Sequence, residues 1–288
     1  MTNPSRPVRQ DILLATTVSD RHLAAFPTSF DVQRKFKGKR FHVQWINNFP
    51  ILLSSMGTII CFMEHIQAAM LELPQMPWDG ELYVHGWTQE TINGVTGRTV
   101  DKHEDSHLVE AHIFDLAFSG GTQTDRTEAL EILRSLIKHP LYLAENVPST
   151  KSTWVEHCSI FLKEGYEGII LRHPKGRYRI QNPAYRSPQL LKYKPTERDT
   201  YLIIGFKEGT ERLAGSLGSI LVQPHDGGAS FYVGTGKVFT DYNRKKLWQE
   251  RDSLIGKQLV VKHEPIETVG GIPICTVGME IKEQNRDE

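Results

Sequence analysis

The sequence changes in character after Pro195, and this change constrains the fold more than any other feature. Beyond it, short apolar runs alternate with glycine-rich turns: YLIIGF (201–206), GSILVQP (218–224), FYVGTG (231–236) and QLVVKHEPI (258–266). One helix interrupts these runs, at roughly 241–252. Short strands with a single helix are typical of a small β-barrel. We therefore expect two domains, 1–197 and 198–288, joined in the polar segment PTERDT.

The segment before Pro195 mixes strand and helix patterns without strict alternation. KRFHVQWI (39–46) places Phe41, Val43 and Trp45 on one face of a strand. Helices are expected over 61–73, over 125–138, and from Thr153 to Gly165, where Glu156 would complete a capping box. Further strands are expected at 81–85, 109–116 and 167–172. This mixture predicts an α+β domain rather than a doubly wound sheet.

The composition is that of a globular protein, with 39% hydrophobic and 24% charged residues. No apolar run approaches the roughly 20 residues that a membrane-spanning helix needs, and the N-terminal MTNPSRPVRQ has no apolar signal core. Cys61, Cys158 and Cys275 match no zinc or redox spacing. These features predict a cytoplasmic protein with no membrane partner.

Positive charge is concentrated in two places, although the chain as a whole has a net charge of zero. RKFKGKR (34–40) holds five basic residues and no acid. The second cluster contains one acid, Glu197, against the bases Arg172, Lys175, Arg177, Arg179, Arg186, Lys192, Lys194 and Arg198. Local clusters in a neutral chain indicate sites that bind phosphates.

Five short motifs occur in a fixed order: KFKGKR (35–40), DGELYVHG (79–86), HIFDL (112–116), EGIILR (167–172) and LLKYKP (190–195). Each is weak alone, because a lysine before a glycine is usually a turn and EGIILR reads as an edge strand. In this order they resemble the nucleotidyltransferase motifs of ATP-dependent DNA ligases, especially the small bacteriophage-type enzymes. FKEGTERLAGSLGSILV and VGTGKV resemble the OB-fold domain of the same family.

The resemblance implies a fold and a set of site residues. The fold is a nucleotidyltransferase (adenylation) domain of ATP-grasp-like antiparallel sheets with helices, followed by an OB-fold β-barrel. Lysine must attack the α-phosphate of ATP as a free amine, which nearby cations and partial burial favour. The implied roles are as follows: Lys35 as the nucleophile that carries AMP; Gln33 as a reader of adenine; Arg40 and Glu81 as ribose ligands, with Arg40 also near the nick; Phe114 stacked on the purine; Glu167, with Glu81, as a metal ligand; and Lys192 and Lys194 on the α-phosphate.

The implied reaction seals nicks in duplex DNA. AMP would pass from ATP to Lys35, then to the 5′-phosphate of the nick, and leave when the 3′-hydroxyl attacks. Mg²⁺, replaceable by Mn²⁺, suits carboxylate oxygens. The partner is nicked DNA, contacted by Lys37, Arg172, Lys175 and Arg177, and the enzyme is expected to be a monomer without a separate N-terminal DNA-binding domain. Such an enzyme would serve DNA replication, repair or recombination.

Three positions depart from the family pattern. Lys37 stands where an acid usually follows the nucleophile by two residues, and Ser55 stands where an arginine usually holds the 5′-phosphate. Ile274 stands where a basic residue usually faces the departing pyrophosphate, which leaves Lys282 as the nearest candidate. We hypothesise that Lys37 compensates for the arginine that is missing at position 55.

Other functions share part of this pattern. RNA ligases and mRNA-capping guanylyltransferases use the same lysine chemistry, with RNA ends or GTP as substrates. A non-catalytic nucleic-acid-binding protein could retain the fold after losing activity. Against that alternative, Lys35, Glu81, Glu167, Lys192 and Lys194 are all present.

Overall fold

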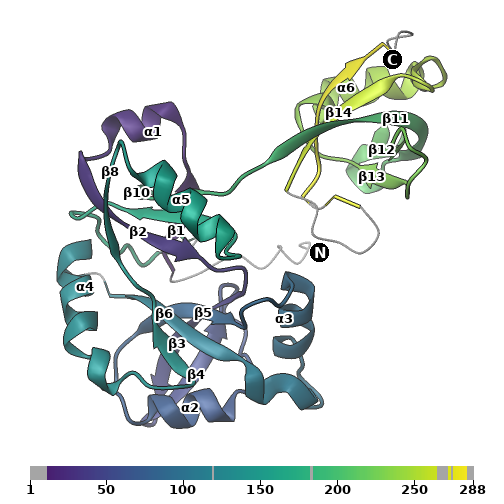
Figure 1. Ribbon diagram of the computed structural model, residues 1–288. Coiled ribbons are helices and arrows are strands. Elements are labelled where there is room, and N and C mark those ends of the chain that lie inside the picture. Colours follow the sequence, from purple (N-terminus) through teal and green to yellow (C-terminus); the bar gives the residue numbers. More distant parts are fainter. Residues whose placement is uncertain (1–11, 119, 182–183, 265–271, 274, 284–288) are drawn as a thin grey trace. The chain divides into compact units, whose positions relative to one another are not determined.

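The computed structural model describes residues 12–118, 120–181, 184–264, 272–273 and 275–283. The chain divides into two compact units, Met1–Lys194 (unit 1) and Pro195–Glu288 (unit 2), and Figure 1 labels their elements. The observed boundary follows Lys194. The boundary expected from the sequence, after residue 197, lies three residues further along the chain, inside β11 (Glu197–Glu208). None of the described helices has the length and apolar character that a membrane crossing requires.

Unit 1 contains two five-stranded sheets among its described residues. The first, in the order β1-β10-β9-β2-β8, consists of β1 (Leu14–Thr17), β10 (Arg186–Tyr193), β9 (Gly168–Arg172), β2 (Ser29–Lys35) and β8 (Val147–Thr150). The second, in the order β4-β3-β5-β6-β7, consists of β4 (Phe49–Ser54), β3 (Lys39–Ile46), β5 (Trp78–Tyr83), β6 (Glu110–Leu116) and β7 (Leu141–Leu143). Neighbouring strands are antiparallel except β1 with β10 and β6 with β7. The α+β class is therefore confirmed.

Helices cover these sheets through apolar faces. The helices of unit 1 are α1 (Asp20–Ala25), α2 (Glu64–Met70), α3 (Gln89–Thr96), α4 (Gln123–Ile132) and α5 (Trp154–Lys163), with 3₁₀ turns η1 (Glu104–Leu108) and η2 (Arg134–Leu136). Phe41 and Val43 of β3 pack with Ile66 and Met70 of α2 in one core. Phe161 of α5 lies in a second core with strands of the first sheet. The alternation of apolar residues in β3 and β2 gives each sheet one buried face.

The positions of the expected helices are confirmed, but several boundaries and one cap differ. The helix expected over 61–73 is limited to Glu64–Met70, and the one over 125–138 ends at Ile132 before a 3₁₀ turn. The capping box expected at Thr153 is wrong, because Thr153 has helical backbone angles and its side chain accepts no capping hydrogen bond. Thr122 and Asp125 form such a box at the start of α4 instead.

A tight turn joins the two sheets directly after Lys35. β2 ends at Lys35 and β3 begins at Lys39. A Cβ atom at Gly38 would collide with the carbonyl oxygen of Leu82 and lie 2.7 Å from Cγ of Glu81. Only glycine therefore allows this turn to pass so close to β5. The close approach brings Lys35 of the first sheet towards Glu81 of the second.

Unit 2 is a five-stranded antiparallel sheet in the order β13-β12-β11-β14-β15. Besides β11, its elements are β12 (Leu217–Gln223), β13 (Phe231–Val233), β14 (Gln258–His263), β15 (Val277–Lys282), α6 (Asp241–Gln249), and the 3₁₀ turns η3 (Glu211–Leu213), η4 (Lys237–Phe239) and η5 (Arg251–Leu254). Gly236, after β13, forms a parallel bridge with Gly278 of β15. The two outer strands of the sheet are therefore brought together. Strands lie at all four expected places, although β13 and β14 end before the expected runs 231–236 and 258–266 do, and β15 is an additional strand.

Candidate active site

The site begins with an ion-pair cluster around Glu167. β2 and β9 are antiparallel neighbours, with Lys35 opposite Gly168, so Glu167 lies beside Lys35. The Glu167 carboxylate pairs with the Lys35 ammonium through Oε2, and Lys194 Nζ donates to Oε1 at 3.0 Å. Three residues that are far apart in the sequence therefore form one continuous charge cluster.

Lys192 extends this cluster into the pocket. It lies on β10, opposite Ile170 of β9, and is half-buried. Burial lowers the pKa of Lys192, and the positive charges of Lys35, Arg186 and Lys194 lower it further. Lys192 in β10 and Lys194, which follows the strand directly, therefore both lie near Lys35.

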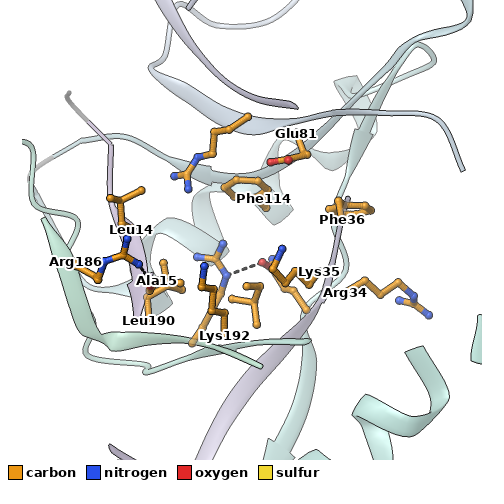
Figure 2. Close-up of a pocket in the computed structure, with 14 residues that line it drawn as sticks. Leu14, Ala15, Arg34, Lys35, Phe36, Glu81, Phe114, Arg186, Leu190 and Lys192 are labelled. Atoms are coloured by element: carbon orange, nitrogen blue, oxygen red, sulfur yellow. Dashed lines mark hydrogen bonds between the residues drawn. The ribbon is translucent and has the colours of Figure 1, made fainter. Parts of the chain in front are cut away.

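A pocket collects side chains from both sheets of unit 1. Figure 2 shows Lys35 and Lys192 of the first sheet, and Glu81 and Phe114 of the second, converging on it. The complete lining consists of Leu14, Ala15, Gln33, Arg34, Lys35, Phe36, Arg40, Glu81, Phe114, Ile170, Arg172, Arg186, Leu190 and Lys192. A hollow with an aromatic wall and cationic groups has the chemistry to hold a nucleotide.

Glu81 sits in this pocket as a desolvated carboxyl group. Burial raises its pKa to about 7, although Lys35 and Arg40 oppose the rise. The negative charge of Glu167 adds to the rise. Glu81 and Glu167 are therefore close enough to interact electrostatically and together offer hard oxygen ligands.

Arg40 is held by a partner that the sequence analysis missed. Its Nε donates to Asp79 Oδ1 at 2.8 Å and its Nη2 to Oδ2 at 2.5 Å, while Tyr178 Oη donates to the same Oδ2 at 2.6 Å. Asp79 is fully buried. Burial opposes the charge on Arg40, but Asp79 overcomes it and raises the pKa of Arg40 above its usual value. The motif DGELYVHG contains this acid two residues before Glu81, but it does not show which residue the acid contacts.

Phe114 lies between two guanidinium groups. The Cζ atom of Arg40 is 4.9 Å from the ring centroid, and that of Arg172 is 5.6 Å away. Such contacts are favourable because the π face of the ring is electronegative. Phe114 lines the pocket and also packs against the buried cluster that contains Phe36 and Tyr83, so stacking on a purine stays a prediction.

The residues expected to contact DNA do not share one environment. Lys175 and Arg177 are exposed in the segment after β9, and Lys37 is half-exposed in the turn between β2 and β3. Arg172 is only 3% exposed and donates to Gln33 and Asp115. We therefore correct the assignment of Arg172 to DNA binding, since a buried guanidinium with carboxylate and amide partners is closed to a phosphate backbone.

The departures from the family pattern lie in different surroundings. Ser55 lines a polar hollow that also includes Lys39, Arg40 and Glu81. Ile274 lies outside the described residues. Lys282 is in β15, 3.7 Å from a carboxylate oxygen of Glu280.

Two places in the described chain offer groups for a metal ion. Glu81, which lines the pocket, and Glu167, which pairs with Lys35 and Lys194 beside it, are carboxylates of the kind that Mg²⁺ prefers. In unit 2, ligand atoms of Glu197, Asp199 and His263 lie within 4.8 Å of one another. There His263 Nε2 lies 2.8 Å from Asp199 Oδ2, a contact that joins β14 to β11.

Comparison with known proteins places this geometry in context. No protein-family model matches the chain. The DNA ligase of African swine fever virus is 27% identical over 208 residues, which cover 68% of this chain and 48% of that protein. The DNA ligase of Thermococcus onnurineus is 32% identical over 172 residues, which cover 54% of this chain and 30% of that protein. The chain spans about half the length of the viral relative.

Solved structures agree in fold. A Lig E DNA ligase aligns with a TM-score of 0.75 at 20% identity, covering 93% of this chain and 98% of that one. The ATP-dependent DNA ligase of bacteriophage T7, solved in complex with ATP, aligns with a TM-score of 0.53 at 16% identity, covering 95% of this chain and 98% of that one. These matches confirm the resemblance to DNA ligases. At such identities, the structural matches show a shared fold.

Proposed function

We propose that this chain is an ATP-dependent DNA ligase that seals 3′-hydroxyl/5′-phosphate nicks in duplex DNA. The observation that carries the proposal is the Lys35–Glu167–Lys194 cluster, next to Lys192 in a pocket with an aromatic wall. The fold and the sequence relatives support it, since both comparisons lead to DNA ligases.

In the first step, Lys35 Nζ would attack the α-phosphorus of ATP. A P–N bond forms and the bond to pyrophosphate breaks, so AMP becomes attached to the lysine. The Lys35 ammonium must first lose a proton, and the Glu167 carboxylate in contact with it is an acceptor within reach. Lys192 and Lys194 lie where they can stabilise the charge that develops on the α-phosphate.

Other residues of the pocket would position the nucleotide. Phe114 offers a ring face to the base, and Glu81 offers a carboxylate to the ribose hydroxyls. Arg40, whose orientation Asp79 fixes, would contact the ribose or the nick. Glu81 and Glu167 would hold Mg²⁺, which neutralises phosphate charge when bound.

The next two steps would use the same groups. The 5′-phosphate of the nick attacks the lysyl-AMP and releases Lys35, and the 3′-hydroxyl then attacks the DNA-adenylate and releases AMP. Each is an in-line displacement at phosphorus, so one set of cations can serve all three. The exposed Lys175 and Arg177, with Lys37 at the turn, supply backbone contacts to DNA.

We also infer that unit 1 is the adenylation domain and that unit 2 is an OB-fold. Five antiparallel strands, a parallel bridge between Gly236 and Gly278, and a helix between β13 and β14 support the OB-fold assignment. Such barrels commonly bind nucleic acid.

The decisive experiment is the sealing of a singly nicked DNA duplex with ATP and Mg²⁺ by the native chain and by Lys35→Ala. Joining by the native chain only supports the proposal. Joining of an RNA nick but not a DNA nick would indicate an RNA ligase, and covalent labelling by GTP alone would indicate a guanylyltransferase. DNA binding without covalent labelling by either nucleotide would indicate a non-catalytic DNA-binding protein.

A further inference from the structure

The amide of Gln33 is fixed by a hydrogen bond from Arg172. Arg172 Nε donates to Gln33 Oε1 at 2.6 Å. A guanidinium has only donors. The amide oxygen must therefore face Arg172, because the reverse orientation would bring two N–H groups together. The position of the Gln33 NH₂ group follows from that contact.

Arg172 is itself held in place by two further side chains. Its Nη1 donates to Asp115 Oδ2 at 2.8 Å and to Gln123 Oε1 at 2.9 Å. Arg126 binds the same two partners, through Nε to Asp115 Oδ1 at 2.7 Å and through Nη2 to Gln123 Oε1 at 2.8 Å. The network therefore connects β2, β6, α4 and β9.

All members of this network are buried. The exposed fractions are 2% for Gln33, 1% for Asp115, 3% for Gln123, 0% for Arg126 and 3% for Arg172. Buried charged hydrogen bonds of this kind are strong and strictly oriented. The Gln33 carboxamide is consequently held in one orientation by neighbours that cannot easily rearrange.

One atom of the network has no partner. Gln33 Nε2 is a buried donor without a hydrogen bond in the described structure. Gln33 lines the same pocket as Lys35 and Phe114. An unpaired buried donor is costly unless a ligand supplies an acceptor. A base bound in the pocket would supply that acceptor. Its hydrogen bond would offset the cost of moving the atoms that bury Nε2.

The fixed orientation distinguishes two purines. Adenine presents a ring-nitrogen acceptor next to an exocyclic amine donor, which a glutamine side chain matches with its NH₂ and its oxygen. The Watson–Crick edge of guanine presents a ring N–H next to a carbonyl, so the glutamine would have to turn over. Arg172 prevents this reversal.

We propose that Arg172 and Asp115 are positioning residues that lock Gln33 in its adenine-accepting orientation and thereby select ATP over GTP. This inference rests on the proposed function, because it concerns the nucleotide that reacts with Lys35. It assigns to Arg172 a role in nucleotide choice in place of DNA contact.

The test measures covalent labelling of the whole two-unit chain with ATP or GTP labelled at the α-phosphate, in Mg²⁺, over a range of nucleotide concentrations. We compare the native chain, Arg172→Lys, Arg172→Met and the control Arg21→Met, which removes an exposed arginine of α1. For Arg172→Met we expect the ATP/GTP preference to fall roughly 10- to 100-fold. The fall should come from a higher KM for ATP, while the maximal labelling rate changes little because Lys35 is intact.

Arg172→Lys retains a donor and a positive charge next to Asp115, so it should keep an intermediate preference. Arg21→Met should match the native chain. Gln33→Met provides a second variant that leaves every charge in place, and it should also lose the preference. Full native preference in a folded Arg172→Met or Gln33→Met chain would overturn the inference.

Labelling of the native chain with each nucleotide distinguishes failure of this inference from failure of the proposed function. Labelling by neither nucleotide would reject the proposed function. Equal labelling by ATP and GTP would leave the lysine chemistry intact and reject only the orientation lock.

Discussion

Replacing Glu81 with glutamine should make the folded chain more stable at alkaline pH than the native chain. Burial raises the pKa of Glu81 from 4.5 to about 7 in the folded state. Between these two pH values, the folded chain keeps a proton that the unfolded chain has lost. The free energy of unfolding therefore falls as pH rises through this window, and the loss is complete above it. The side-chain amide of the Glu81→Gln variant cannot ionise, so the variant avoids the loss.

The size of the effect follows from the pKa difference. A rise in pKa from 4.5 to about 7 corresponds to at most about 3.4 kcal/mol. Glu81 is partly exposed, and solvent screening reduces the expected value to about 1–2 kcal/mol. At about pH 5 the two chains should differ little, because most of the loss lies at higher pH.

The assay is urea denaturation at about pH 5 and about pH 8, with bound AMP removed by pyrophosphate and no divalent metal present. Tryptophan fluorescence reports mainly on unit 1, which contains Trp45, Trp78, Trp87 and Trp154. Glu90→Gln, at an exposed position of α3, is the matched control and should follow the native chain. A parallel loss of stability in native and Glu81→Gln chains would refute the view of Glu81 as a desolvated carboxyl group.

Four further outcomes are expected. Glu167→Gln should slow lysyl-AMP formation at least about tenfold, measured by transfer of labelled AMP, because the variant cannot form the ion pairs to Lys35 and Lys194. Lys37→Asp should weaken binding to a nick with a 5′-phosphate about tenfold more than binding to a nick with a 5′-hydroxyl. An equal effect on both nicks would reject the hypothesis that Lys37 compensates for the arginine missing at position 55. Replacing both Lys175 and Arg177 with alanine should reduce the slope of log affinity against log salt concentration by about 2, because each residue would contact one phosphate. Fluorescence anisotropy measures this slope, and an unchanged slope would exclude both residues from the DNA contact. Arg244→Met should lower the free energy of unfolding by about 3 kcal/mol or more in urea denaturation, because Arg244 donates to four backbone carbonyls of unit 2. An unchanged free energy of unfolding would contradict this role of Arg244.

Much of the fold was predictable because local patterns carry it. The strand at 39–46 appears with the expected boundaries, since the alternation of apolar residues has the period of a strand. Helix positions were also predictable, but their ends were not. Thr153 fails as a cap because its hydroxyl lies 3.2 Å from Ser149 Oγ and 3.0 Å from Thr150 Oγ1, in a turn that the helical pattern does not reveal.

The candidate site was only partly predictable. Lys35, Glu81, Phe114 and Lys192 were identified from motif resemblance, and the structure collects them in one pocket. Asp79 was missed, because an acid in a strand motif gives no sign that an arginine 39 residues away will pair with it. Such pairs depend on the register between strands.

The sequence by itself determined which side chains are charged or nucleophilic, and the period of each strand and helix, because residue type and spacing are local properties. Only the tertiary structure decided what each charge does. Arg172 and Lys175 are both basic residues close together in the sequence, yet one is buried against Asp115 and the other is exposed. Burial and pairing depend on neighbours supplied by distant strands, and these neighbours determine whether a charge can contact DNA or instead orients the residue beside it.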